Sequence, residues 1–130
     1  MMDQITPKEE AADLLKRAKQ QIPNLTLSGI GIRYEGQEAL EDRLDEIATC
    51  AEWLKRINQI ETINKRHTSY GYKHSVERWR RSPTSTGEST PSYVANGSFI
   101  AAAVGLGFKF MQFGPNACFN FSERALKQLR

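Results

Sequence analysis

Helical spacing of apolar residues defines the first part of the chain. The stretch Thr6-Pro7-Lys8-Glu9 has the form of a capping box with proline at the first helical position, and apolar side chains then recur at helical spacing until Pro23. Residues 25–34 indicate a strand, in which Gly29 and Gly31 permit a bulge where the apolar side chains change face. Because this G-x-G pattern lacks a third glycine in register, we favour a bulged strand over a nucleotide-binding loop.

The longest helical pattern covers residues 37–63. Apolar residues alternate by four and three between Leu40 and Leu54, and Trp53, Ile57 and Ile60 continue the apolar surface on a shifted stripe. The regular seam lasts for only about two heptads, so we expect a long helix that is buried in its own domain. A homodimer through the 37–63 helix stays open as an alternative.

A basic helix is expected over residues 68–81. Thr68 and Ser69 are good N-cap types, because a hydroxyl there can accept a hydrogen bond from a backbone N–H of the first turn. Tyr72 and Trp79 then fall on one apolar face, together with a valine between them. One face of this helix is thus predicted to pack against the core, and the remaining faces carry positive charge.

The next segment is a predicted flexible loop. Residues 82–92 contain serine, threonine, proline and glycine but no apolar residue. The stretch 99–106 is apolar on all sides, which is typical of a buried helix, with Ser92 or Asn96 as its cap and Gly107 at its end.

The C-terminal part predicts a β-hairpin followed by a short helix. Phenylalanines alternate along residues 108–113 and again along 118–121, and the sequence Gly114-Pro115-Asn116 between them is typical of a turn. Ser122 then begins a last helix. The hairpin is the clearest strand pair that the sequence predicts.

Together these elements predict a single small α+β domain with four to five helices and a small antiparallel sheet, in which the 25–34 strand can join the C-terminal hairpin. From residue 37 onward their order is that of a winged helix-turn-helix domain, with the hairpin as the wing. The parts are an N-terminal helix and strand (1–36), a winged-helix-like core (37–121) that includes the flexible loop (82–92), and a C-terminal helix (122–130), all within one domain (1–130).

The two halves of the chain carry opposite charge. Residues 1–64 hold 8 Lys/Arg against 12 Asp/Glu, which gives −4, and residues 65–130 hold 10 against 3, which gives +7, in agreement with the overall +3. The segment 65–81 alone contains six of these basic residues and both histidines of the chain. A basic surface of this kind suggests a polyanionic partner, either nucleic acid or an acidic protein.

The basic helix therefore predicts a small regulatory protein that binds nucleic acid, with DNA favoured over RNA. The helix after the loop offers no arginine, lysine or glutamine for bidentate contacts with base edges, so we expect weak sequence specificity. The predicted interface consists of cations for phosphate contacts, histidines and hydroxyls at the helix start, and polar residues of the second helix: Lys65, Arg66, His67, Thr68, Ser69, Lys73, His74, Arg78, Arg80, Arg81, Asn96 and Ser98.

The alternative is a protein-binding or inhibitory module that presents the same basic surface to an acidic partner without catalysis. An enzyme is less favoured. His74 and Glu77 lie at i and i+3, where the carboxylate could orient a histidine base, but no nucleophile is assigned by spacing. We accordingly predict no catalytic residues, no metal site and no cofactor.

Cysteine usage and hydropathy favour a cytoplasmic protein. Cys50 and Cys118 form neither a CxxC pair nor a metal-ligand cluster, and we expect free thiols. The acidic start of the chain does not resemble a signal peptide. The longest apolar stretch, residues 99–106, is too short for a bilayer span of about 20 residues, so no membrane partner is expected.

Overall fold

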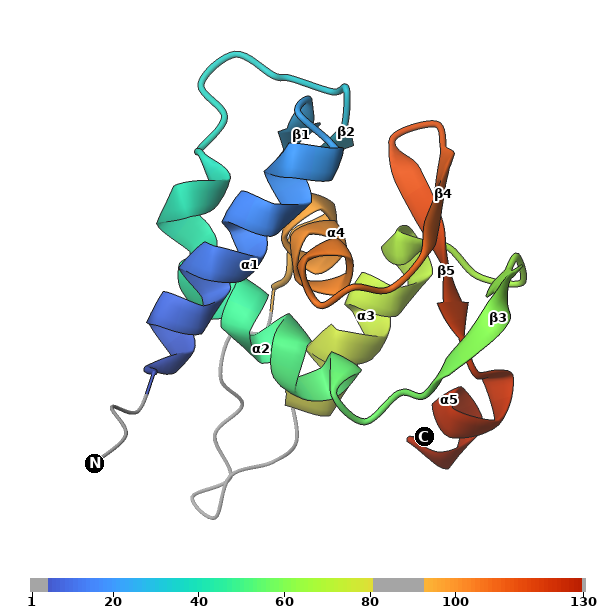
Figure 1. Cartoon of the computed structure of the whole chain (residues 1–130). Helices are drawn as coiled ribbons and strands as arrows, with labels where there is room; N and C mark the ends of the chain where they lie inside the picture. The colour runs from blue at the N-terminus through green and yellow to red at the C-terminus, as the bar shows by residue number, and fades with distance from the viewer. Residues whose placement is uncertain (1–4, 81–92, 130) are drawn as a thin grey trace.

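The computed structural model describes residues 5–80 and 93–129 (Figure 1). Five α-helices and two antiparallel sheets confirm the α+β class. No helix in these two ranges combines the length and the apolar character needed to cross a membrane. The elements in chain order are α1 (Pro7–Gln21), β1 (Leu25–Thr26), β2 (Gly29–Ile30), the 3-10 helix η1 (Leu40–Arg43), α2 (Leu44–Leu54), β3 (Gln59–Asn64), α3 (Ser69–Arg80), α4 (Asn96–Gly105), β4 (Phe110–Phe113), β5 (Asn116–Phe121) and α5 (Glu123–Gln128).

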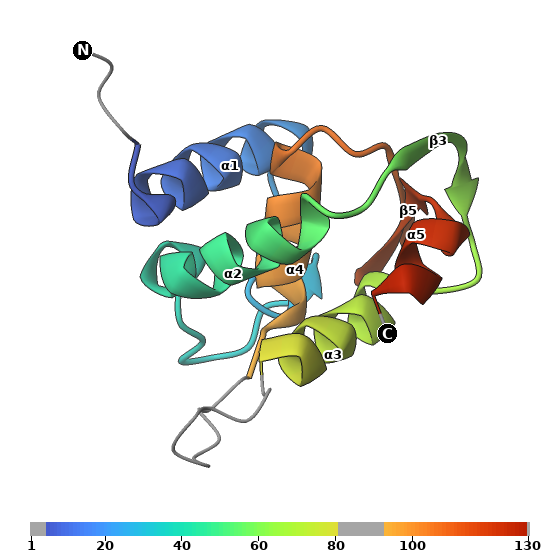
Figure 2. The same ribbon diagram turned by 90° about the horizontal axis from the view of Figure 1, so that it is seen from below.

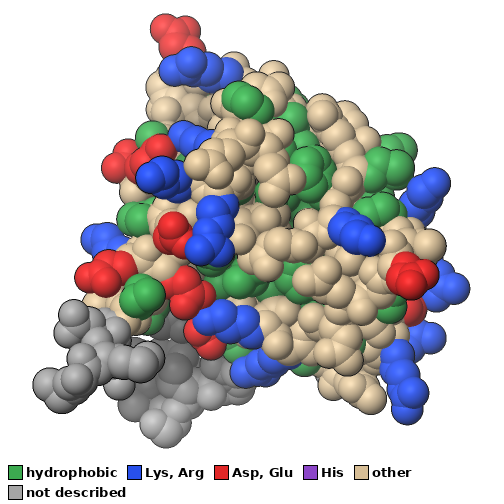
Figure 3. Space-filling model, in the orientation of Figure 1, with side chains coloured by type: hydrophobic (Ala, Val, Ile, Leu, Met, Phe, Trp, Pro, Cys, Tyr) green, Lys and Arg blue, Asp and Glu red, His purple; other side chains and the backbone are tan. Residues whose placement is uncertain are grey.

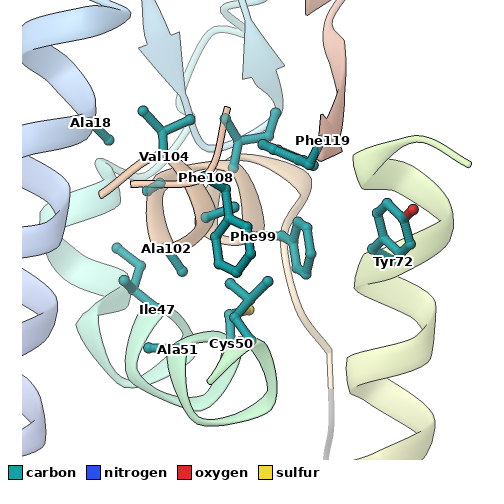
Figure 4. Packing of buried hydrophobic residues seen from close by; sticks show 14 of the residues in the cluster. Ala18, Ile47, Cys50, Ala51, Tyr72, Phe99, Ala102, Val104, Phe108 and Phe119 are labelled. Carbon is teal, nitrogen blue, oxygen red and sulfur yellow. The ribbon is translucent and has the colours of Figure 1, made fainter. Parts of the chain in front are cut away.

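Helix α4 lies at the centre of the molecule, as its apolar sequence predicts. All of its residues are buried, and Figure 2 shows it between α1 and α2 on one side and the sheet with α3 on the other. The Phe99 ring packs against Tyr72 and Phe119, with centroid distances of 5.7 and 5.9 Å, among apolar side chains that converge from several elements (Figure 4). The core is therefore built around this helix.

Local signals set the ends of several helices as predicted. The Thr6 hydroxyl accepts a hydrogen bond from the Glu9 N–H at 3.1 Å, which caps α1. The Ser122 hydroxyl caps α5 in the same way. Gly107 follows α4 with a φ of 96°, a left-handed conformation that glycine adopts without steric cost. The predicted loop at 82–92 lies outside the described residues.

The predicted long helix over 37–63 is wrong. This segment is divided into η1, α2 and the strand β3. At the end of α2, the N–H groups of Arg56 and Ile57 bond to carbonyls only three residues back, which tightens its last turn. The chain then pairs with β5, and its β-branched residues suit that strand. The seam residues Ile47 and Leu54 are fully buried within this chain, while a homodimer stays an untested prediction.

The predicted C-terminal hairpin is confirmed, but its third strand is not the expected one. β4 and β5 pair from Phe110↔Phe119 to Phe113↔Asn116 around the Gly114-Pro115 turn. The sheet order is β3-β5-β4, so β3 occupies the place that we expected for residues 25–34. β1 and β2 instead form a hairpin of their own. A long-range pairing of this kind leaves no local signature in the sequence.

The small β1–β2 hairpin covers the start of α4. The Gly97 N–H donates to the Leu27 carbonyl at 2.8 Å, and the Ile30 N–H donates to the Pro115 carbonyl at 2.9 Å. Helix α4, the β4–β5 turn and the N-terminal hairpin are thereby joined. The helices α2, α3 and α4 and the β4–β5 hairpin follow one another as predicted, but the strand β3 between α2 and α3 was not predicted, and α4, which would have to enter a DNA groove in a winged helix, is enclosed by the chain itself.

Replacing Gly97 by alanine tests this close packing. A Cβ at Gly97 would lie 1.8 Å from the Thr26 carbonyl oxygen, so we expect the free energy of unfolding to fall by about 3 kcal/mol. Gly71→Ala in α3 is the matched control, because a Cβ there meets nothing within 4 Å and alanine should stabilise the helix by about 0.5–1 kcal/mol. Urea unfolding measures both, and equal stability of the two variants would contradict the packing.

Candidate functional site

The start of α3 is anchored on the three-stranded sheet. Ser69 is fully buried, and its hydroxyl accepts a hydrogen bond from the Ala117 N–H at 3.1 Å. The Thr68 carbonyl accepts the first helical bond, from the Tyr72 N–H. The predicted helix start is thus confirmed. A phosphate contact from Ser69 stays a prediction, but the hydroxyl is already bonded to β5.

Lys73 and His74 both contact Glu77 within α3. The Lys73 ammonium lies 3.1 Å from Glu77 Oε2, and His74 Nδ1 lies 2.8 Å from Glu77 Oε1. Lys73 is 6% exposed, so the predicted phosphate contact would require this buried ion pair to open. Breaking such a pair is costly because a buried charge is left without a partner.

Glu77 holds the chain that enters α4. The Val94 N–H donates to Glu77 Oε2 at 2.9 Å. Burial acts to raise the pKa of Glu77, but the hydrogen bonds from the Val94 N–H, Lys73 and His74 outweigh burial and hold that pKa below its ordinary value of 4.5. The charged form of this carboxylate is therefore part of the folded structure.

A second buried carboxylate, Glu46 of α2, caps α4 directly. Its Oε1 atom accepts hydrogen bonds from the Ala95 N–H at 2.9 Å and from the Ser98 hydroxyl at 3.1 Å, and its Oε2 atom accepts one from Arg43. The predicted cap by Asn96 is wrong, because Ala95 is the N-cap residue and no side chain of its own caps the helix. Ser98 is fully buried and is occupied by Glu46. The other predicted cap, Ser92, lies outside the described residues.

Asn96 joins three segments at the start of α4. Its amide nitrogen donates to Asn116 Oδ1 at 2.8 Å, and the carbonyls of Ser28 and Pro115 lie at 3.3 and 3.4 Å. The residue is 7% exposed. Contacts from Asn96 or Ser98 to a nucleic acid stay untested, but both side chains are engaged inside the protein.

Contacts of Glu123 bring together two distant parts of the chain that both carry exposed cations. The Glu123 carboxylate at the start of α5 accepts a hydrogen bond from the Asn64 amide at 3.0 Å and lies 3.3 Å from His67 Nε2, which places α5 beside the β3–α3 connection. The Asn64 hydrogen bond also holds the pKa of Glu123 below its ordinary value. We call the exposed cations of these two segments the basic edge: Lys65, Arg66, Arg124 and Lys127.

None of the four cations of the basic edge forms a salt bridge within the described residues, although the Glu123 carboxylate interacts electrostatically with Arg66. Figure 3 shows lysine and arginine side chains along the right-hand side of the molecule, over the part that carries β3 and α5. Among the described residues from 65 onward, Lys73 is the only lysine or arginine in a salt bridge. In the first half of the chain, by contrast, Lys19 bonds Glu41 and Lys55 bonds Glu10, both at 2.8 Å.

The remaining predicted contact residues lie elsewhere on α3. Arg78 is exposed and donates to the Ser75 hydroxyl at 3.3 Å. Arg80 is also exposed and donates to the Thr49 hydroxyl of α2 at 2.9 Å. Arg81 lies outside the described residues. The predicted nucleic-acid contact residues therefore lie in several different parts of the structure and do not form one face.

Two residues of the basic edge were missed by sequence reasoning. Arg124 and Lys127 lie 59 and 62 residues after Lys65 and were assigned only to a closing helix. No local feature of the sequence indicates that α5 and the β3–α3 connection meet, which they do through the contacts of Glu123 with Asn64 and His67. Their proximity depends on the β3–β5 pairing, which the predicted long helix excluded.

The described residues offer little for catalysis or metal binding. No group of three or more histidine, cysteine, aspartate or glutamate side chains in them could hold a metal ion. Cys50 and Cys118 are buried free thiols, and burial raises the pKa of both, which disfavours the reactive thiolate. The His74–Glu77 pair does form, but its carboxylate also binds Val94 and Lys73 and thereby supports the fold.

Comparisons with models of protein families, with curated proteins and with solved structures gave no match.

Acid unfolding of Glu77→Gln tests the role of this carboxylate. The lowered pKa means that the stability supplied by ionised Glu77 is fully present above pH 4.5 and is lost as the pH falls through the lower folded-state pKa. At neutral pH the variant should lose about 3 kcal/mol of unfolding free energy, and below pH 4.5 the gap to the wild type should narrow.

Glu61→Gln on the exposed face of β3 is the control for this experiment, and its unfolding free energy should change by less than about 0.5 kcal/mol. Equal stability of Glu77→Gln and this control between pH 3 and 7 would contradict the structural role of the Glu77 carboxylate. This range covers about four pH units around the ordinary carboxyl pKa.

Proposed function

We propose that the protein binds nucleic acid, with DNA favoured over RNA, through the phosphate contacts of the basic edge. The observation that carries this proposal is that α5 lies beside the β3–α3 connection and that both segments carry exposed cations, none of which forms a salt bridge within the described residues. Cations in this state attract the phosphate backbone and release its condensed counterions on binding. We place this activity in the cytoplasm as part of the same proposal, since both cysteines are free thiols.

The burial of α4 supports a mode of binding that reads phosphates more than bases. Direct readout needs side chains that reach base edges in a groove, and every residue of α4 is buried under the chain. The basic edge offers lysine and arginine on a connection and a short helix, which suit contacts with the sugar-phosphate backbone. We therefore expect affinity that depends steeply on salt and little on sequence.

An acidic protein surface would be attracted to the same four cations. Nucleic acid is the better-supported partner because a duplex presents a dense and regular array of charge, which suits cations that form no salt bridge within the described residues. The salt dependence of the binding affinity distinguishes a nucleic acid from an acidic protein, since only for a polynucleotide does its slope count the phosphate contacts.

A charge-matched pair of triple variants tests the proposal. Lys65→Gln/Arg66→Gln/Lys127→Gln removes three cations of the basic edge, whereas Lys8→Gln/Lys16→Gln/Arg33→Gln removes two lysines and one arginine that are exposed in the N-terminal half. Both variants change the net charge from +3 to 0. Fluorescence anisotropy with a labelled duplex across a salt series should show a slope of log K against log salt that is shallower by about 2.7 for the first variant only.

Equal loss of affinity in the two variants would indicate that net charge alone matters and would reject the basic edge as the interface. No binding of duplex or single strand by the wild type at low salt would reject nucleic acid altogether and would turn attention to an acidic protein partner.

A further inference from the structure

Two exposed tyrosines from different elements share the Lys73 ammonium as a neighbour. Tyr70 belongs to the first turn of α3, and Tyr93 belongs to the chain that enters α4, which runs beside α3 (Figure 4). The ammonium lies over both rings, 5.6 Å from the centroid of Tyr70 and 4.8 Å from the centroid of Tyr93. We call these two rings the tyrosine platform.

The rings of the platform are open to solvent. Tyr70 is 55% exposed and Tyr93 is 63% exposed, whereas Lys73 beneath them is buried. The exposed area of each ring therefore lies mainly on the side away from Lys73. A flat aromatic surface of this kind favours contact with another planar ring, because offset stacking adds to the gain from burial of apolar area.

The charge cluster around Glu77 holds the platform in place. Lys73 and His74 contact the Glu77 carboxylate at 3.1 and 2.8 Å. The His74 ring also packs edge to face against Tyr70, with a centroid distance of 4.8 Å, and it lines a groove beside α3 and α5. Rings that are held in this way lose little conformational freedom when a ligand stacks on them, which favours binding.

The platform lies next to the basic edge along the chain. Tyr70 follows Arg66 by four residues, so even a fully extended chain would separate their Cα atoms by at most about 14 Å. A strand whose phosphates contact Lys65 and Arg66 can therefore place a neighbouring base on Tyr70. A base inside a duplex cannot do so, because it stays within the stack of base pairs.

We propose that the tyrosine platform stacks unpaired bases, which makes single-stranded DNA the preferred ligand of the basic edge. This inference rests on the proposed nucleic-acid function and assigns the strand form that the site takes. Exposed rings beside exposed cations fit a ligand that alternates planar bases with phosphates, whereas an acidic protein surface supplies only the anions. Stacking tolerates every base, which agrees with an interface whose helix α4 is buried and reads no base edges.

A ligand without bases tests the stacking with the wild-type protein. Fluorescence anisotropy compares a labelled oligothymidylate of about eight nucleotides, within the usual range of single-strand site sizes, with an abasic oligomer of equal length and charge. The oligothymidylate should bind about 100-fold more tightly, which corresponds to about tenfold for each base that stacks on a tyrosine. A closed duplex should bind more weakly than the oligothymidylate in the same salt.

Substitutions at the two tyrosines assign the contact. Tyr70→Ala and Tyr93→Ala should each weaken binding of the oligothymidylate about tenfold and leave binding of the abasic oligomer unchanged. Tyr70→Phe and Tyr93→Phe keep the ring and should bind like the wild type. Tyr34→Ala is the matched control, because Tyr34 is 62% exposed but lies on the connection between β2 and η1. All three side chains are exposed, so the urea midpoints of these variants should stay close to that of the wild type.

Four results would overturn the proposal. These are equal affinity for the oligothymidylate and the abasic oligomer, alanine variants at the platform that bind no more weakly than Tyr34→Ala, phenylalanine variants that bind as weakly as the alanine variants, and tighter binding of the duplex than of the single strand.

The salt slope separates failure of the platform from failure of the proposed function. Loss of a platform ring should lower the affinity and leave the slope of log K against log salt unchanged, because all phosphate contacts remain. A normal slope without preference for bases would therefore reject the platform alone. Absence of binding to every oligomer at low salt would reject the nucleic-acid function itself.

Discussion

Two buried carboxylates at the N-terminus of α4 support the arrangement of the whole molecule. The first N–H groups of a helix have no partner within the helix, and α4 is buried where its own cap residue, Ala95, supplies no side-chain acceptor. Glu46 from α2 accepts from the Ala95 N–H, and Glu77 from α3 accepts from the Val94 N–H. Negative charge at this end of a helix is favourable. Arg43, which is partly exposed, pairs with Glu46, and buried Lys73 pairs with Glu77, so that paired charges join α2 and α3 to the start of α4.

This constraint decides which chemistry is left for the surface. Polar groups that resemble binding residues in the sequence, such as Lys73, Asn96 and Ser98, are used to fix α4 and the hairpins around it. The periphery keeps the exposed cations of the basic edge and the aromatic groove beside α3 and α5. Arg78, whose phosphate contact stays a prediction, is exposed and lines this groove. The central helix thus acts as a scaffold, and the proposed binding activities lie on the elements that surround it.

Local signals predicted most elements, and long-range contacts account for most errors. The hydroxyl caps at Thr6 and Ser122, and the apolar character of 99–106, depend on neighbours in sequence, and the structure confirms them. The end of α2 and the strand β3 depend on pairing with β5, some 60 residues away. The helical spacing of apolar residues therefore wrongly predicted that the helix continues through this segment. For the candidate site, Lys65 and Arg66 were predicted as phosphate contacts; both are exposed, and the contacts themselves stay a prediction. The sequence could not indicate that α5 would supply Arg124 beside them, because that depends on the Glu123 contacts.

The central claim is that the periphery meets nucleic acid while α4 stays enclosed. NMR titration of the nitrogen-15-labelled protein with an unlabelled DNA duplex at low salt tests it most directly. The account predicts that amide signals of residues 65–67 and 124–128 shift, while those of Asn96–Gly105 in α4 keep their positions. Shifts concentrated in α4 and the β1–β2 hairpin would contradict the account, because the central helix would then have to leave its carboxylate partners to reach the DNA.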